Sequence, residues 1–185
     1  MTDSGSRFRN IALTGFKSSG KTRIGKMLAK KLKMQYLDID TVMEDIHARS
    51  GDAPLSVRSI YRKYGEDYFR RLEGIALKEA AKKRSVVLSL GGGTPLNRAF
   101  RKAGFKNTGF VYLNVKPSML YARIKQKGLP PFIDKKRPRA PFNELLAIRK
   151  PVYEKIADVT VDNTDRKPME CVKEIIEKLG AHSGR

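Results

Sequence analysis

Short apolar runs rich in β-branched side chains alternate along the chain with longer stretches in which apolar residues recur every three or four positions. The first pattern predicts buried strands and the second predicts amphipathic helices. We expect strands at Asn10–Thr14, Gln35–Asp38, Val86–Leu90, Gly109–Asn114 and Val159–Asp162. We expect helices at Lys21–Leu32, Asp40–Arg49, Tyr68–Ala81, Pro117–Lys127, Asn143–Ile156 and Pro168–Leu179. Strands alternating with helices predict an α/β fold with a parallel sheet.

Two segments interrupt this alternation, and we interpret both as irregular. The first is SGDAPLSVRSIYRKYGED, residues 50–67, and the second is KGLPPFIDKKRPRAP, residues 127–141. Long irregular segments within a compact domain are commonly functional or lack fixed structure. The second segment is rich in proline and cations, so it fits either a mobile lid over a phosphate site or a flexible surface loop.

The length of 185 residues suits a single α/β domain with a sizeable core. No run approaches the roughly 20 apolar residues needed to span a bilayer, and the first residues lack the apolar core of a signal peptide. We therefore expect a cytoplasmic protein without a membrane partner. Cys171, as a lone cysteine, excludes an internal disulfide and supports no metal cluster.

The charge balance is strongly basic, because 39 Lys and Arg face 19 Asp and Glu, giving a net charge of +20. Such a field attracts nucleic acid, but it equally attracts ATP or an acidic metabolite. Many of the cations lie on helical stretches, where they can form solvated faces. The sequence has no RNP-like aromatic motif, zinc-finger spacing or clear helix-turn-helix, so we do not expect nucleic acid as the main partner.

The segment GFKSSGKT, Gly15–Thr22, fits the phosphate-loop pattern G-x-x-x-x-G-K-[ST]. It follows an apolar strand and opens a helix, and this order favours a phosphate site over a simple glycine turn. Backbone N–H groups of such a loop converge on the phosphates, the lysine reaches the β- and γ-phosphates, and the threonine hydroxyl binds Mg²⁺. We expect ATP to contact Ser18, Ser19, Gly20, Lys21, Thr22 and Arg23.

The tetrapeptide LDID places Asp38 and Asp40 at the carboxyl end of the second predicted strand. In an open parallel sheet this end lines the ligand crevice, and residues two apart in an extended chain share one face. One carboxylate could orient Mg²⁺ through water while the other accepts a proton from an attacking hydroxyl. Alternatively, Asp40 only caps the helix that follows.

Two further motifs supply groups for an anionic acceptor. In YFRRLE, Arg70 and Glu73 are neighbours on a helix, so Glu73 can orient a guanidinium that suits a carboxylate; a surface ion pair is the alternative. In LSLGGGTP, the glycines 91–93 let a ligand approach the backbone, or they form a tight turn. Arg149, in IRKPVY, has no partner that the sequence identifies.

Taken in order, the phosphate loop, D-x-D, GEDYFRRLE, LGGG and RKPVY resemble shikimate kinase, and the resemblance covers about residues 8–180. It implies a P-loop NTPase fold with three α/β/α layers and a five-stranded parallel sheet. It implies one domain over residues 1–185, with an acceptor-binding subdomain at about 41–73 and a mobile lid at about 127–142. The implied reaction transfers the γ-phosphate of ATP to the 3-hydroxyl of shikimate, with Mg²⁺, in aromatic amino-acid biosynthesis.

The resemblance also implies roles at the acceptor end. Asp40 would bind the reacting diol and act as the candidate catalytic base, and Lys21, the second catalytic residue, would stabilise the transferred phosphoryl group. Arg70 and Arg149 would bind the shikimate carboxylate, and Glu73 would hold Arg70 in position. The backbone of Gly92 would hold ring hydroxyls.

At the nucleotide end the resemblance implies that Thr22 and Asp38 serve the metal. Arg123 and Arg166 would lie beside the adenine. We expect ATP and shikimate to be the only partners, and the protein to be a monomer.

The chain departs from the family pattern in the lid. The family has an arginine where Pro130 stands; Arg137 or Arg139 could replace it, and Lys127 is a poorer candidate. Ser18 stands where the family generally has glycine, and the acceptor segment is about three residues longer. These departures leave open a related kinase for another hydroxylated acid, sugar or nucleotide, or a binder of ATP or nucleic acid without catalysis.

Overall fold

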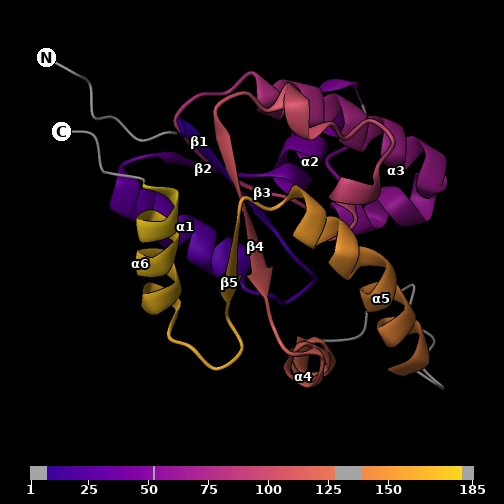
Figure 1. Cartoon of the computed structure of the whole chain (residues 1–185). Helices are drawn as coiled ribbons and strands as arrows, with labels where there is room; N and C mark the ends of the chain where they lie inside the picture. The colour runs from indigo at the N-terminus through magenta and orange to yellow at the C-terminus, as the bar shows by residue number, and fades with distance from the viewer. Residues whose placement is uncertain (1–7, 52, 128–138, 181–185) are drawn as a thin grey trace, which may run out of the picture.

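The central feature of the fold is one parallel sheet with the strand order β2-β3-β1-β4-β5. The structure is a computed structural model that describes residues 8–51, 53–127 and 139–180. The strands are β1 (Asn10–Thr14), β2 (Gln35–Asp38), β3 (Val86–Ser89), β4 (Thr108–Asn114) and β5 (Val159–Asp162). All neighbouring pairs are parallel, and Figure 1 shows their arrows pointing toward the end of the molecule where α4 lies. The predicted five-stranded parallel sheet is confirmed.

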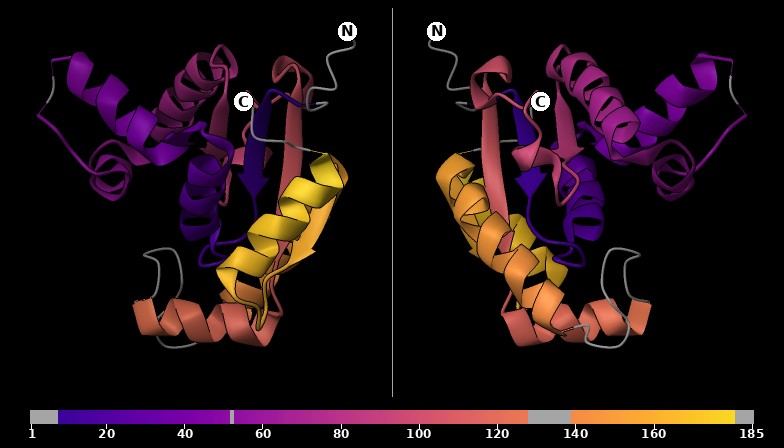
Figure 2. Two further views of the ribbon diagram at one scale, coloured as in Figure 1. Left: turned by 90° about the vertical axis from the view of Figure 1, so that its left-hand side faces the viewer. Right: turned by 90° about the vertical axis from the view of Figure 1, so that its right-hand side faces the viewer.

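Helices cover both faces of this sheet. They are α1 (Lys21–Leu32), α2 (Ile39–Arg49), α3 (Val57–Ala81), α4 (Pro117–Lys127), α5 (Arg139–Ile156) and α6 (Pro168–Leu179). Helix α6 faces the viewer in the left view of Figure 2 and α5 faces the viewer in the right view, with the sheet between them. None of the helices in the described part of the chain combines the length and apolarity needed to cross a bilayer.

The core explains why the strands are apolar almost throughout. Alternate residues of a strand point to opposite faces, so Ile11 and Leu13 pack with α1 and α6, whereas Ala12 packs with α2 and α3. Farther along the second face, Tyr112 of β4 packs with α4 and α5. The three central strands β1, β3 and β4 are buried on both faces and so are mostly apolar, whereas the outer strands β2 and β5 are only partly buried.

The prediction that residues 50–67 are irregular is wrong from Val57 onward, where the chain is helical except for a kink at Gly65. Helix α3 begins at Val57, where Ser56 caps the helix and the carboxylate of Glu44 accepts a hydrogen bond of 2.9 Å from the Val57 backbone. The apolar side of this turn packs on α2 through the buried Ile60. A kink at Gly65, with φ 78°, separates it from the predicted helix.

The other differences concern where elements begin and end. Helix α5 begins at residue 139 rather than 143, so the last part of the expected lid is helical. The remainder of that lid, residues 128–138 with Pro130 and Arg137, lies outside the described residues. Helix α2 begins one residue before the prediction, β3 ends one residue early and β4 begins one residue early.

Candidate active site

A cleft of about 730 Å³ lies where the loops after β1, β2 and β3 meet helices α3 and α5. Its lining includes eight of the predicted site residues: Ser18, Lys21, Thr22, Asp38, Asp40, Arg70, Gly92 and Arg149. The lining of this cleft does not include Ser19, Gly20, Arg23, Arg123 or Arg166. The structure thus joins the acceptor motifs to the phosphate loop in one space.

The phosphate loop takes a conformation that depends on two glycines. Gly15 has φ 144° and Gly20 has φ 99°, and both lie in the region that side chains disfavour. A Cβ on Gly15 would lie 2.8 Å from the Leu113 carbonyl oxygen, and one on Gly20 would lie 2.5 Å from Asn163 Nδ2. Ser18 adopts φ 66° without being glycine, so this departure from the family costs backbone strain but preserves the loop.

Lys21 folds back over this loop. Its Nζ donates hydrogen bonds to the carbonyl oxygens of Gly15, at 2.8 Å, and Phe16, at 3.0 Å. Burial lowers the pKa of Lys21 to about 8, while the charges of Asp40 and Asp38 act in the opposite direction. An anion that replaced the two carbonyls would favour the charged form of this amine.

The two carboxylates of LDID have different positions from those predicted. Asp38, not Asp40, caps the helix: its Oδ1 accepts a hydrogen bond of 3.2 Å from the Asp40 backbone, and its Oδ2 accepts one of 2.8 Å from the Tyr36 hydroxyl. The chain is therefore not extended across both residues, because Asp40 lies in the first turn of α2. Burial and the charge of Asp38 raise the pKa of Asp40 to about 6, and Lys21 opposes the shift.

Arg70 is held as the YFRRLE motif predicts, by a buried Glu73. Its Nη1 donates to Glu73 Oε2 at 3.0 Å, and its Nε to Glu66 at 3.4 Å. The side chain of Glu73 is only 4% exposed and also accepts from Thr94 at 2.6 Å and from Asn97 at 2.7 Å. This is therefore not an isolated surface ion pair. Arg70, Thr94 and Asn97 all donate to the Glu73 carboxylate, which in turn orients the Arg70 guanidinium. Sequence reasoning missed Thr94 and Asn97, which carry no signal beyond following the glycine run.

Arg149 joins Arg70 beside the glycine run. A Cβ on Gly93 would lie 3.4 Å from Arg70 Nη1 and 3.7 Å from Arg149 Nη2. The Arg149 guanidinium also lies 5.4 Å from the centre of the Phe16 ring, a cation–π contact with the phosphate loop. Two cations from α3 and α5 therefore converge at one point of the cleft wall.

The glycine run lies between these cations and Asp40. A Cβ on Gly91 would lie 3.4 Å from Asp40 Oδ1, and one on Gly92 would lie 3.6 Å from Arg149 Nη1. The hydroxyl of the buried Tyr153 donates a hydrogen bond of 2.5 Å to the Gly92 carbonyl and so fixes this strand-end. The sequence included Tyr153 in RKPVY but gave no role for it.

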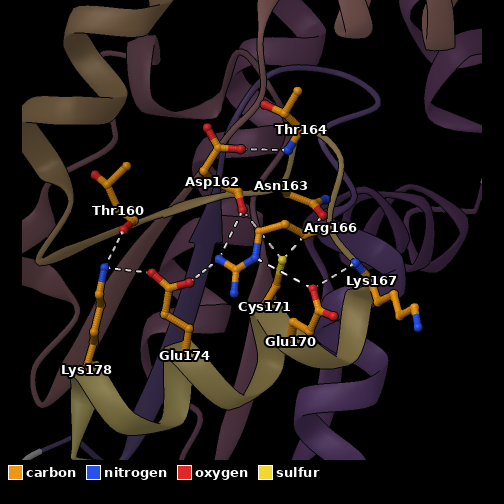
Figure 3. Close-up of polar contacts among 10 residues, drawn as sticks. All are labelled: Thr160, Asp162, Asn163, Thr164, Arg166, Lys167, Glu170, Cys171, Glu174 and Lys178. Atoms are coloured by element: carbon orange, nitrogen blue, oxygen red, sulfur yellow. Dashed lines mark hydrogen bonds and ion pairs between the residues drawn. The ribbon is translucent and has the colours of Figure 1, made fainter.

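The predicted adenine-side residues lie around the loop between β5 and α6. Arg123 donates to the carbonyl oxygens of Asn163, at 3.1 Å, and Thr164, at 2.6 Å. Asn163 in turn donates a hydrogen bond of 2.8 Å to the Ser19 carbonyl, which connects this loop to the phosphate loop. Figure 3 shows Arg166 engaged with Glu174 and with the Asp162 carbonyl instead of projecting from the loop.

The lid candidates are only partly described. Arg139 begins α5, is exposed, and lies 5.4 Å from the centre of the Tyr121 ring. Arg137 lies outside the described residues, and α4 ends at Lys127.

Comparison with known proteins identifies the family that has these motifs. The model of the shikimate kinase family matches residues 17–180. The chain belongs to the shikimate kinase family. It is therefore an ATP-dependent kinase, as the motif order predicted.

Individual relatives agree with the family model. A shikimate kinase of Thermus thermophilus is 37% identical over 174 residues, covering 94% of this chain and 91% of the relative. One of Caldanaerobacter subterraneus is 33% identical over 177 residues, covering 96% of this chain and 99% of the relative. Among solved structures, shikimate kinase from Acinetobacter baumannii in complex with shikimate has a TM-score of 0.79 at 26% identity, covering 92% of each chain. The predicted P-loop kinase fold is confirmed.

Proposed function

We propose that this member of the shikimate kinase family transfers the γ-phosphate of ATP to the 3-hydroxyl of shikimate, yielding ADP and shikimate 3-phosphate for aromatic amino-acid biosynthesis. The observation that carries the proposal is the convergence of Arg70 and Arg149 at Gly93, in the cleft that also holds Lys21 and Asp40. Shikimate is a small carboxylate with several hydroxyls, so it needs a cationic site at one end and hydrogen-bond acceptors at the other.

The two guanidinium groups bind the carboxylate of the acceptor. Each presents a planar set of donors that matches the two oxygens of a carboxylate. Glu73 is already bonded to Arg70, so that side chain is fixed before the acceptor arrives and loses little freedom on binding. With the carboxylate fixed there, the ring extends along the glycine run and its hydroxyls lie beside Asp40.

Asp40 acts as the general base. Its pKa of about 6 leaves it mostly ionised at neutral pH, yet still basic enough to accept a proton. The hydroxyl proton passes to the Asp40 carboxylate, the hydroxyl oxygen forms a bond to the γ-phosphorus, and the bond to the β,γ-bridging oxygen breaks with its electron pair remaining on ADP. Lys21 exchanges its loop carbonyls for the phosphates and stabilises the charge that the transferred group carries.

Thr22 and Asp38 fit a magnesium ion that arrives with ATP. Both line the cleft beside Lys21. Magnesium at such sites is usually bound by one or two protein oxygens together with substrate phosphates. When bound, the ion neutralises phosphate charge.

The test is ADP release from Mg·ATP with and without shikimate. We expect a rate that depends on shikimate and is lost in Lys21→Met. Analogues should be compared in the same assay: one with the carboxylate replaced by an amide, and one without the 3-hydroxyl. Absence of any shikimate-dependent rate would overturn the proposal.

A panel of sugars, hydroxylated acids and nucleoside monophosphates would then identify a related acceptor. ATP binding without turnover of any acceptor would indicate a non-catalytic binder.

A further inference from the structure

Basic segments immediately precede four of the five strands. Arg9 precedes β1, Lys33 lies two residues before β2, Arg84 precedes β3 by two residues and Lys106 precedes β4 by two. In a parallel sheet all strands start at the same end of the sheet. This end lies opposite the carboxyl ends of the strands, which line the cleft (Figure 1). These cations therefore lie on the side of the molecule away from the kinase site.

Backbone hydrogen bonds place the segments side by side. The Gln35 N–H, at the start of β2, donates to the Ser85 carbonyl at 2.9 Å, and the Arg9 N–H donates to the Asn107 carbonyl at 2.8 Å. These bonds join the β2 and β3 segments and the β1 and β4 segments.

The side chain of Asn10 joins the two pairs, because its Nδ2 donates to the Lys83 carbonyl at 3.0 Å. Neighbouring strands lie about 4.8 Å apart, so the four segments form a row roughly 15 Å long. We call this row the cationic edge. Its members are all exposed: Arg9, Lys33, Lys82, Lys83, Arg84 and Lys106.

Helix dipoles explain only part of this row. The exposed Lys30 and Lys31, in the last turn of α1, and Lys82, at the end of α3, complement the negative ends of their helices. Lys106 follows only the single 3₁₀ turn Lys102–Gly104, and Arg9 directly precedes β1, so neither lies in the last turn of a described α-helix. Helix dipoles therefore leave the charges of Arg9 and Lys106 unexplained.

Two carboxylates close to the segments that carry the cationic edge bind cations outside it. Asp158, which precedes β5, pairs with Lys102 at 2.6 Å and also accepts a hydrogen bond of 2.8 Å from the Phe110 backbone. Glu79, in the last turn of α3, pairs with Arg49 at 3.1 Å. The exposed members of the edge can therefore meet an external anion.

The cationic edge has no fully exposed large hydrophobic side chain among the described residues. Those that are exposed belong to other segments: Tyr61, Ile75, Leu96, Ile148 and Met169. The neighbouring Phe8 and Met34 are half-buried and pack against the core. Single-stranded nucleic acids are usually bound with aromatic side chains that stack on bases, and peripheral membrane binding usually adds inserted apolar side chains. A row of cations without such exposed groups fits the phosphates of a duplex.

We propose that the cationic edge binds the phosphate backbone of a nucleic acid duplex, without regard to sequence, on the side opposite the kinase cleft. A row of roughly 15 Å lies alongside about nine charges of a duplex, which carries one negative charge per roughly 1.7 Å of its length, so several phosphates come within reach of the row. This second surface gives a role to part of the +20 charge.

The test is fluorescence anisotropy with a labelled DNA duplex of about 20 base pairs, over a series of salt concentrations. The edge variant carries Arg9→Glu, Arg84→Glu and Lys106→Glu. A matched control carries Arg62→Glu, Lys125→Glu and Lys173→Glu, which are exposed elsewhere. Both variants have a net charge of 20 − 6 = +14. Thermal unfolding of all three proteins checks that each is folded.

We expect the unmodified chain to bind with a Kd of roughly 10⁻⁴ to 10⁻⁶ M near physiological salt. The edge variant should bind at least about tenfold more weakly than the control, and its salt slope should be shallower by about 3, because three phosphate contacts are lost. Saturating ATP and shikimate should not displace the duplex.

Four outcomes would overturn the assignment. Equal losses in the two variants would indicate diffuse attraction to net charge. Displacement by ATP would place binding in the cleft. Tighter binding to a single strand of the same length, or to vesicles containing phosphatidylserine, would assign the edge to a different partner. Absence of duplex binding at low salt would remove the surface function, and none of these results bears on shikimate phosphorylation.

Discussion

Arg70 and Arg149 converge on the backbone at Gly93, although α3 and α5, which carry them, are separated in the chain by two strands and α4. Two like charges this close repel, and the buried Glu73 bonded to Arg70 offsets part of that repulsion. Arg149 also contacts the Phe16 ring. An anionic acceptor beside the glycine run would interact favourably with both guanidinium groups.

Replacing Arg70 by lysine tests whether this guanidinium binds the acceptor through a fixed pair of donors. A lysine preserves the charge but loses the planar donor set and its bond geometry to Glu73. We expect the KM for shikimate to rise at least about tenfold, with a smaller change in kcat and none in the KM for ATP.

Arg71 provides the matched control, because it is the next residue of α3 and is exposed. Arg71→Lys should leave both KM values unchanged. Equal kinetics for Arg70→Lys and the parent enzyme would remove Arg70 from the acceptor site.

Gly93→Ala tests the point of convergence itself. Gly93 has φ −101°, so alanine fits its backbone, and the added methyl would lie 3.4 Å from Arg70 and 3.7 Å from Arg149. The methyl would occupy space beside both guanidinium groups without unfolding the protein. We expect the KM for shikimate to rise about tenfold and the unfolding temperature to change little. Gly104→Ala is the control, since a Cβ there would contact no atom within 4 Å; a larger kinetic effect at Gly104 would contradict this interpretation.

The sequence predicted the sheet and the phosphate loop well because both depend on local patterns. The bounds of β1, β2, β5, α1, α4 and α6 match the predictions to the residue. The error at residues 57–67 has a tertiary cause, since the start of α3 is stabilised by Glu44 of α2 and by packing of Ile60 on that helix. Neither partner is visible in the local sequence.

Sequence motifs predicted the individual residues of the candidate site, but they did not predict which of these residues lie together. Ordered motifs identified Asp40, Arg70 and Arg149, yet only the folded chain brings them together. The roles of Asp38 and Asp40 at the start of α2 depend on where the strand ends, which alternation alone leaves uncertain by a residue or two. Tyr153 was missed because its hydroxyl partner, Gly92, lies far away in the sequence.

The pH dependence follows from Asp40 and Lys21. Asp40 must be ionised to accept a proton, and burial raises its pKa to about 6, so kcat/KM should rise as pH increases through about 6. Lys21 must be protonated to bind phosphates, and burial lowers its pKa to about 8, so kcat/KM should fall as pH increases through about 8. A bell-shaped pH profile of kcat/KM for ATP, with one limb near pH 6 and the other near pH 8, would support both assignments.

Asp40→Asn tests whether the acidic limb of the pH profile belongs to Asp40. We expect kcat to fall by about 10² to 10⁴ with the KM for ATP nearly unchanged, and the acidic limb to disappear. The raised pKa of Asp40 favours the folded state at low pH, and this contribution is lost as pH rises from about 4 through about 6. Ionised Asp40 is therefore unfavourable at neutral pH, and the variant should unfold at a temperature no lower than the parent. An intact acidic limb would assign the base to another group.

Tyr153→Phe tests how the glycine run is held. The change removes one hydroxyl from a fully buried side chain and leaves the Gly92 carbonyl without its 2.5 Å donor. Gly92 is half-buried and lines the cleft, so we expect the loss of this hydrogen bond to lower the free energy of unfolding by about 0.5–1.5 kcal/mol. The strand-end beside Arg149 should also shift, raising the KM for shikimate more than the KM for ATP. Tyr121→Phe, a change of the same atoms on α4, is the comparison for urea unfolding and kinetics. If Tyr153→Phe lowers stability but leaves both KM values as they are, the hydroxyl supports the fold alone and does not position the acceptor site.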